Sequence, residues 1–155
     1  MSSPASQMAK NLVSSPRINP RYACFSLSIR RSKIHRYGVY AKEAIPANRK
    51  VIEYTGERIT TAEANLRDFG NVTYLFELDK DWTIDGAVGG SGAEIINHSC
   101  EPNLISRVMK GHILYMSLRE IKPGEELTID YRFDDPGEET PCRCGSAICR
   151  GKIET

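Results

Sequence analysis

The stretch Gly92-Ala93-Glu94-Ile95-Ile96-Asn97-His98-Ser99-Cys100-Glu101-Pro102-Asn103 contains one of the five cysteines of this chain. Three more stand close together near the C-terminus, in Cys142-Arg143-Cys144-Gly145-Ser146-Ala147-Ile148-Cys149. Three clustered thiols leave one over if they form disulfides, but all three can bind one metal ion. A structural zinc takes four ligands in a tetrahedron, and Cys100 supplies the fourth. The sequence therefore predicts a C-terminal segment clipped by zinc onto the distant segment that contains Cys100.

The composition is that of an ordinary globular chain. Of its 155 residues 40% are hydrophobic and 26% charged, and the net charge is +1. This length suits one domain with a real core. A charge so close to zero gives no general attraction to polyanions, so we expect no direct nucleic-acid partner and no membrane partner. No apolar run reaches the length of a membrane span, and residues 1–20 lack the apolar centre of a secretory signal.

The odd number of cysteines bears on the cellular compartment. An odd count disfavours a secreted disulfide framework and favours a reducing compartment with a metal site. The cysteine outside the proposed zinc set, Cys24, is expected to be buried in a strand.

Most of the chain has the pattern of short strands. We expect them at residues 24–29, 38–41, 50–54, 74–78, 82–85, 103–109, 112–118 and 127–131. The Lys110-Gly111 pair predicts a tight hairpin turn. One helix is expected at 60–69, because Thr60 and Glu63 form a capping box and Gly70 provides a stop. The pattern alone predicts a mainly β domain.

Four motifs, in order along the chain, carry a resemblance to a known family. They are 32–41 (SKIHRYGVYA), 92–103 (GAEIINHSCEPN), 124–131 (GEELTIDY) and the C-x-C-x4-C segment followed by Arg150-Gly151. Together they resemble the SET-domain protein lysine methyltransferases with a post-SET zinc segment. The resemblance covers the chain from about Phe25 to Ile153.

The resemblance implies a fold and a division of the chain. SET domains consist of several small twisted β-sheets around a C-terminal pseudoknot, in which the segment holding Asp130-Tyr131 would thread beneath a preceding loop. We expect a flexible N-terminal tail at residues 1–22 and a SET domain at 23–133. An acidic linker and the short zinc-binding post-SET tail would occupy residues 134–155.

It also implies a reaction: methyl transfer from S-adenosylmethionine to a lysine amine. By the match to the family motifs, Tyr131 and Tyr74 are the expected catalytic residues, and Ile129 joins them in the lysine pocket. The family commonly carries phenylalanine or tyrosine at the position of Ile129. Because isoleucine has no hydroxyl and less bulk, we expect dimethylation or trimethylation to be allowed.

The same match implies the cofactor and metal sites. The expected cofactor-binding residues are His35, Arg36, Tyr37, Tyr74, Asn97, His98 and Tyr131, with Ile153 as an adenine contact. Asn97 and His98 are expected to act largely through backbone groups. The zinc on Cys100, Cys142, Cys144 and Cys149 would be structural, since no ligand position stays open. The family usually has glycine where this chain has Arg36, and often Arg-Phe where it has Glu94-Ile95.

The expected substrate is a basic protein tail, most directly a histone, and the expected location is the nucleus, with the cytoplasm also open. Acidic side chains at Glu53, Glu57, Asp79, Asp81, Asp134 and Asp135 form either a docking surface for such a tail or merely solvated turns. Since the cysteine-rich pre-SET segment of the family is missing, we expect a homodimer. Two other interpretations stay open: a catalytically silent chromatin-binding module, and a methyltransferase for a non-histone protein.

Overall fold

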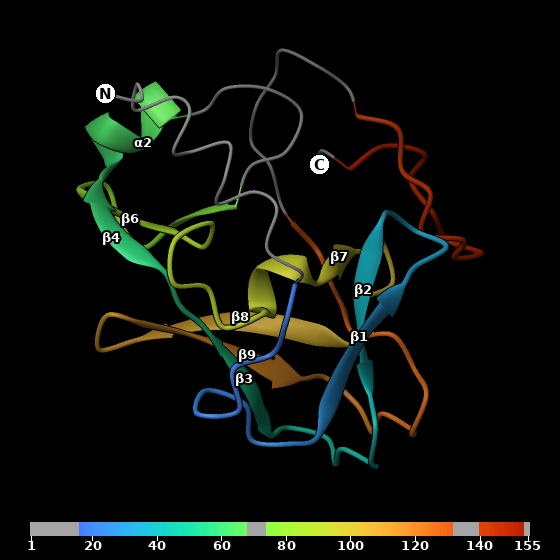
Figure 1. The fold of residues 1–155 in the computed structure, drawn as a ribbon. Helices are drawn as coiled ribbons and strands as arrows, with labels where there is room; N and C mark the ends of the chain where they lie inside the picture. Colours follow the sequence, from blue (N-terminus) through green and yellow to red (C-terminus); the bar gives the residue numbers. More distant parts are fainter. Residues whose placement is uncertain (1–15, 68–73, 132–139, 154–155) are drawn as a thin grey trace, which may run out of the picture.

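The described part of the chain forms three β-sheets, a large one of five strands and two smaller ones of three and two strands (Figure 1). The computed structural model describes residues 16–67, 74–131 and 140–153. Within them the strands are β1 (Leu27–Arg31), β2 (Tyr37–Ala41), β3 (Lys50–Tyr54), β4 (Glu57–Thr60), β5 (Leu75–Glu77), β6 (Trp82–Asp85), β7 (Asn97–His98), β8 (Leu104–Met109), β9 (His112–Ser117) and β10 (Thr128–Ile129). The helices are α2 (Thr61–Arg67) and the 3-10 helix η1 (Ala93–Ile95). The predicted mainly β fold is confirmed.

The largest sheet has the strand order β3-β9-β8-β10-β7. Its β8 and β9 form the predicted hairpin, and the turn residues Lys110 and Gly111 have φ of 51° and 79°, as a type I′ turn requires. Strand β10 is shorter than the expected 127–131 and runs parallel to both its neighbours, β7 and β8. Because residues 99–103 connect β7 to β8, this connection must cross over β10. The crossing is the threaded arrangement that the resemblance implied.

Two smaller sheets flank this one on opposite sides of the view in Figure 1. Strands β1 and β2 form a hairpin in which Leu27 pairs with Ala41 and Arg31 with Tyr37. Strands β4, β6 and β5 form the third sheet, to which α2 is attached. The Thr60 hydroxyl accepts a hydrogen bond from the Glu63 N–H at 3.1 Å, which is the predicted cap of this helix. The predicted residues 68 and 69 of the helix lie outside the described residues.

A single apolar core joins the large sheet to the β1–β2 hairpin. Its fully buried members alternate along the strands, as in Ile113 and Tyr115 of β9. The connection from β2 to β3 adds Ile45, and the approach to β10 adds Ile121 and Leu127, none more than 1% exposed. The motif before Tyr131 is therefore anchored in the core, which fixes where Tyr131 lies.

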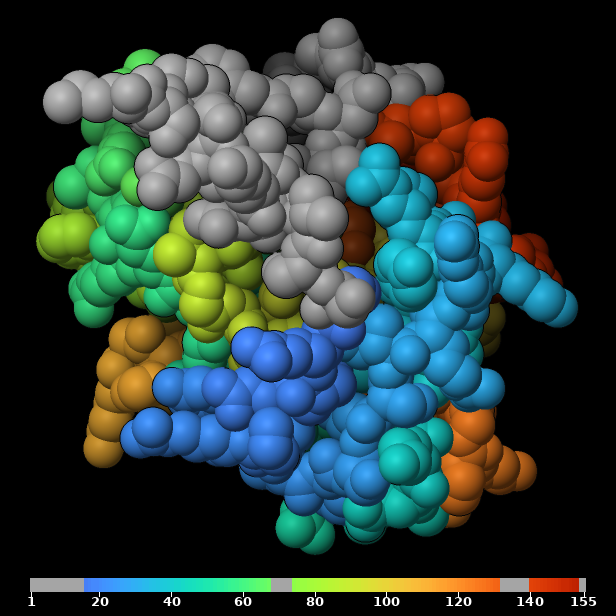
Figure 2. Space-filling model, in the orientation of Figure 1, coloured from blue at the N-terminus to red at the C-terminus, as the bar shows by residue number. Residues whose placement is uncertain are grey.

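One expectation about the N-terminal part, the buried strand position of Cys24, is corrected, and the expected tail at residues 1–22 stays a prediction. Residues 16–22 of the predicted tail pack onto the body: Ile18 contacts the core, and the Asn19 N–H donates to the Ser91 carbonyl at 2.8 Å. Cys24 is exposed and precedes β1, because the strand begins at Leu27. Residues 1–15 lie outside the description. In Figure 2 the blue to cyan residues from 16 onward form much of the surface of this face.

No helix in the described part of the chain is long and apolar enough to cross a membrane.

Candidate active site and metal centre

The four cysteines singled out by their spacing meet in space. Their sulfur atoms all lie within 4.8 Å of one another, with Cys100 Sγ 3.7 Å from Cys142 Sγ and 4.0 Å from Cys149 Sγ. A tetrahedron with zinc–sulfur bonds near 2.3 Å places its sulfurs about 3.8 Å apart. The four thiols therefore fit a structural zinc, with no ligand position left for chemistry.

Backbone groups around these sulfurs suit thiolates. The Arg150 N–H donates to Cys100 Sγ at 3.3 Å, and the Gly151 N–H donates to Cys149 Sγ at 3.4 Å. The segment also closes on itself, since the Cys142 N–H donates to the Gly151 carbonyl at 3.0 Å. Such outer hydrogen bonds orient metal ligands and stabilise their negative charge. We call residues 140–153 the clip.

Asn97, on β7, ties the β1–β2 hairpin to the large sheet. Its side-chain Nδ2 donates to the backbone carbonyls of His35 at 3.2 Å and Tyr37 at 2.9 Å, and to Glu126 Oε1 at 3.0 Å. Both carbonyls belong to the stretch expected to bind the cofactor. The side chain of Asn97 thus holds the stretch of predicted cofactor residues, while its backbone pairs with Thr128 of β10.

His98, also on β7 and 3% exposed, connects the metal centre to Tyr131. Its Nδ1 accepts a hydrogen bond from the Tyr131 backbone N–H at 3.2 Å, and its Nε2 lies 3.5 Å from Cys100 Sγ. Because Nδ1 accepts, the ring proton belongs on Nε2, where it faces the sulfur. The ring also packs against that of Tyr131, with centroids 5.4 Å apart. The two motifs that are distant in sequence therefore meet at this histidine.

The Tyr131 hydroxyl donates to the Ile96 carbonyl at 2.6 Å. Burial raises its pKa well above the ordinary value, and Tyr74 and Glu126 act in the same direction. Burial also raises the pKa of Tyr74, with Arg36 opposing the shift. Because its pKa is raised, the phenol of Tyr131 stays protonated at neutral pH.

An aromatic cluster backs this site. The rings of Tyr54, Phe76 and Tyr115 lie 5.3 to 6.3 Å apart, and the Tyr54 hydroxyl donates to the Tyr74 carbonyl. Ile129, 4% exposed, belongs to the same core, against which Tyr131 packs. Ile129 and Tyr131 are two residues apart along an extended segment, so they share a face. Tyr131 therefore packs against an aromatic and aliphatic core.

Comparison with known protein families assigns the chain to one of them. The family model described as SET domain matches residues 36–132. This chain belongs to the SET-domain family. The matched residues lie inside the range 23–133 that the sequence predicted for the domain, whose outer limits stay a prediction.

Proteins named as histone-lysine N-methyltransferases are similar to this chain over most of its length. It is 41% identical over 138 residues to Histone-lysine N-methyltransferase TRX1 of Oryza sativa subsp. japonica, covering 82% of this chain and 14% of the relative. It is 42% identical over 132 residues to Histone-lysine N-methyltransferase, H3 lysine-4 specific, of Schizosaccharomyces pombe, covering 79% and 14%. The chain thus spans about one seventh of the length of these relatives.

A solved structure is similar in fold. The crystal structure of KRYPTONITE in complex with mCHG DNA and SAH superposes with a TM-score of 0.72 at 31% identity. The match covers 84% of this chain and 29% of that one. The SET fold, including its many small sheets, is thereby shared.

Glu126, which joins the β1–β2 hairpin to Asn97, was not predicted from the sequence. The carboxylate of Glu126 accepts hydrogen bonds from Ser32 at 2.8 Å, Tyr40 at 3.2 Å and Asn97 at 3.0 Å. A Cβ on Gly38 would lie 2.1 Å from Glu126 Oε1, so a larger residue there would displace this carboxylate. A glutamate in a turn-rich motif looks solvated; only its place directly before the buried Leu127 hinted at this role.

The backbone conformation of Arg36 explains why glycine is usual in the family at this position. Arg36 has a φ of 41°, in the left-handed region that favours glycine, which is the residue usual in the family. Glu94, the other departure, accepts a hydrogen bond from the Gly92 N–H at 2.8 Å. Burial raises the pKa of Glu94, and this hydrogen bond opposes the rise. The side chain of Glu94 therefore binds the backbone at the start of η1.

The acidic side chains weighed as a docking surface are largely engaged. Glu57 pairs with Arg67 at 2.8 Å, and Glu53 pairs with His112. Asp79 accepts hydrogen bonds from the N–H groups of Asp81 and Trp82 at 2.8 Å each. Asp134 and Asp135 lie outside the described residues. These contacts favour the solvated-turn interpretation.

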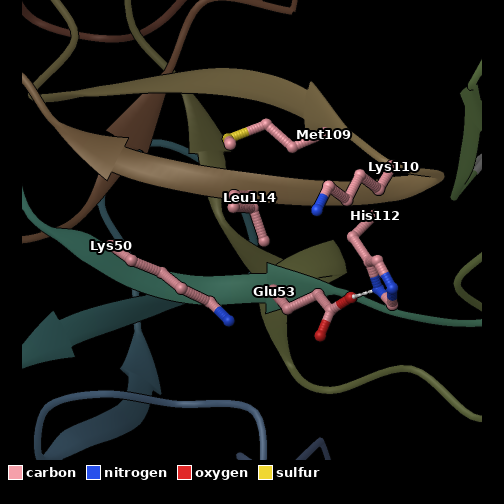
Figure 3. Close-up of a pocket in the computed structure, with 6 residues that line it drawn as sticks. All are labelled: Lys50, Glu53, Met109, Lys110, His112 and Leu114. Carbon is pink, nitrogen blue, oxygen red and sulfur yellow. Dashed lines mark hydrogen bonds and ion pairs between the residues drawn. The ribbon is translucent and has the colours of Figure 1, made fainter.

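A surface hollow of about 280 Å3 lies away from the tyrosines, on the outer face of β3, β9 and β8 (Figure 3). Its lining is Lys50, Glu53, Met109, Lys110, His112 and Leu114. None of these residues belongs to the predicted site. The hollow is open and mixed in charge, and it takes no part in the arrangement around Tyr131.

Proposed function

We propose that this chain is an S-adenosylmethionine-dependent protein-lysine N-methyltransferase, with a histone tail as its expected substrate. The observation that carries the proposal is the meeting of Tyr131, His98 and the cysteine clip beneath the crossing of residues 99–103. The similarity to relatives named histone-lysine N-methyltransferase supports it.

Methyl transfer to lysine needs an uncharged amine. With an ordinary lysine pKa near 10.4, deprotonation at neutral pH costs roughly 4 to 5 kcal/mol. An apolar site disfavours the ammonium form and lowers that cost. The rings of Tyr54, Phe76 and Tyr115 behind Tyr131 supply such surroundings.

The Tyr131 hydroxyl positions groups and does not remove protons. Its proton is donated to the Ile96 carbonyl at 2.6 Å, and its pKa is raised by burial and by Tyr74 and Glu126. The oxygen lone pairs remain to accept from the amine or the polarised methyl group. S-adenosylmethionine supplies the methyl group on a sulfonium when bound, and alignment by the protein does the rest.

The residues that would hold the cofactor are His35, Arg36 and Tyr37 of the hairpin, Asn97 and His98 of β7, and Tyr74 and Tyr131. Support comes from the two hydrogen bonds that Asn97 donates to carbonyls of this hairpin. The Ile153 N–H donates to the Thr140 carbonyl at 2.9 Å, which fixes its backbone in the clip for an adenine contact.

Product multiplicity depends on Ile129. It faces the same side as Tyr131 and carries no hydroxyl that could hold a water in the pocket. We propose that dimethyl-lysine and trimethyl-lysine form. Mass spectra that contain only monomethyl-lysine at saturating cofactor would contradict this.

The test of the function is transfer of labelled methyl groups from S-adenosylmethionine to core histones and to peptides covering their tails. We expect transfer by the native protein, and a loss of 100-fold or more in Tyr131→Phe. The matched control is Tyr22→Phe, since Tyr22 precedes β1 and lies outside the site. No transfer by the native protein to any histone would overturn the histone assignment.

Other interpretations are outcomes of the same test. A silent binding module binds the peptides but transfers no label, and an enzyme for a non-histone protein labels other proteins instead. A nuclear location follows from a histone substrate, and a cytoplasmic one from a non-histone substrate; fluorescence imaging separates them. A homodimer would double the mass seen in sedimentation.

A further inference from the structure

One arginine links the clip to the strand that carries Tyr131. Arg150 directly follows the metal ligand Cys149. Its guanidinium donates to both oxygens of Asp130, at 3.1 and 3.2 Å, in the two-pronged geometry that matches a carboxylate. The same group donates to the Ile153 carbonyl at 2.7 Å, and the Arg150 backbone N–H donates to Cys100 Sγ at 3.3 Å.

Asp130 stands at the other end of this link, next to Tyr131. Its Oδ1 lies 3.6 Å from His98 Nδ1, the atom that accepts the Tyr131 N–H. The other nitrogen of His98 faces Cys100 Sγ at 3.5 Å. The contacts therefore form a closed circuit from Cys149 through Arg150, Asp130, Tyr131 and His98 to Cys100.

We propose that Arg150 is a positioning residue that couples the metal-bound clip to the methyl-transfer site. The inference rests on the proposed function. The circuit joins the clip to the tyrosine through directed polar contacts, and Arg150 makes three of them. When zinc is bound to the clip, Arg150 holds Asp130 and thereby keeps the backbone of Tyr131 against His98.

A purely stabilising role does not account for this geometry. The side chains of Arg150 and Asp130 are 31% and 21% exposed, so solvent screens their attraction and little stability results. A two-pronged pair does fix orientation, because both carboxylate oxygens and the guanidinium plane are set. The expected effect of its loss is therefore on turnover and cofactor affinity.

The experiment compares Arg150→Gln with Arg143→Gln in the full chain. Arg143 lies in the same clip, between two metal ligands, is exposed and forms no ion pair within the described part of the chain. Both variants keep all four cysteines and lose one charge. We expect Arg150→Gln to lower kcat about 10-fold and raise the KM for the methyl donor several-fold, with one zinc per chain retained. Arg143→Gln should keep both constants within 2-fold.

Conservative and double variants sharpen the comparison. Arg150→Lys should recover part of the loss, because lysine keeps the charge but not the fork. Asp130→Asn should resemble Arg150→Gln, and the double variant should be no worse than either alone. Additive losses would overturn the link between the two residues.

Two results for Arg150→Gln would overturn the proposal. Native kcat and KM in Arg150→Gln would overturn the proposal, and so would loss of zinc in that variant, which would make the residue a support of the metal site. If the native protein transfers no methyl group, the binding of S-adenosylhomocysteine is measured by calorimetry instead. In that case the proposed function fails, while weaker binding by Arg150→Gln than by Arg143→Gln still supports the coupling and equal binding overturns it.

Discussion

The β3–β9–β8 part of the large sheet and the C-terminal clip are held in place by different forces. In the sheet, buried residues such as Ile52, Ile113 and Tyr115 come from strands paired over long registers. The clip has few apolar contacts to offer: Ile148 is 65% exposed, and sulfur atoms and polar groups make the attachment. Apolar burial therefore stabilises the sheet, whereas sulfur atoms and polar contacts fix the position of the clip.

This difference predicts that the two regions respond to different perturbations. Apolar burial is spread over many residues and tolerates the loss of one contact with a graded cost. Metal and polar contacts are few, and each one fixes a position. Damage to the sheet should lower stability while the site survives in folded molecules, and damage to the clip should abolish activity in a folded sheet.

Metal removal should have the largest effect. Structural zinc binding is worth about 10 to 16 kcal/mol in small zinc peptides, so its loss should release residues 140–153. We expect Cys144→Ser to contain no zinc, to be cleaved by protease within the clip, and to lose methyl transfer. Far-UV circular dichroism should remain that of the native sheets. Full activity without metal would contradict the account, as would global unfolding.

A core substitution should come next. Ile113 is 1% exposed, so Ile113→Ala should lower the free energy of unfolding by about 2 to 5 kcal/mol in urea titrations. The matched control on the same hairpin is Val108→Ala, since Val108 is 48% exposed and should change stability by about 0.5 kcal/mol or less. Zinc content should stay at one per chain in both. Equal destabilisation by the two would break the comparison.

Asn97 lies where the two regions meet. Asn97→Ala leaves the carbonyls of His35 and Tyr37 without their donor, at a cost of about 1 to 3 kcal/mol. Because the hairpin is then no longer held to β7, affinity for S-adenosylhomocysteine should fall at least 10-fold in calorimetry. Asn65→Ala, on the exposed face of α2, is the control. Unchanged affinity in Asn97→Ala would show that the hairpin is positioned by other contacts.

The smallest effect is expected at Arg67, which pairs with Glu57 at 2.8 Å, Glu63 at 2.7 Å and Asp85 at 3.0 Å. Because these groups are partly exposed, Arg67→Gln should cost about 1 kcal/mol or less. The hydrogen bond from Arg67 lowers the pKa of Glu57, so this contribution is present at neutral pH and is lost as the pH falls through the lowered pKa. Urea midpoints of native and variant protein should therefore converge in acid; a constant gap would contradict this.

Local patterns predicted the sheet well, and long-range contacts account for what was missed. The hairpin at Lys110-Gly111 follows from turn chemistry and alternation over neighbouring residues. The metal set followed from the number and spacing of the cysteines. Glu126 was missed because its partners are far away in sequence and a charged side chain is usually solvated. Cys24 was placed in a strand wrongly, since alternation alone does not locate where pairing begins.

The aromatic backing of the site shows the same limit. Tyr54 and Tyr115 are buried in strands β3 and β9 and look like ordinary inward strand positions. Only the crossing of residues 99–103 over β10 brings Tyr131 in front of them. That crossing came from the family resemblance and not from periodicity, which carries no information about threading.

A crystal structure with S-adenosylmethionine bound tests the central claim most directly, namely that the crossing and the clip build one site around Tyr131. The account predicts the cofactor in contact with Asn97 and His98, with its methyl group directed toward the Tyr131 hydroxyl. A cofactor bound elsewhere, such as in the hollow lined by Lys50, Met109 and Leu114, with Tyr131 untouched, would contradict it.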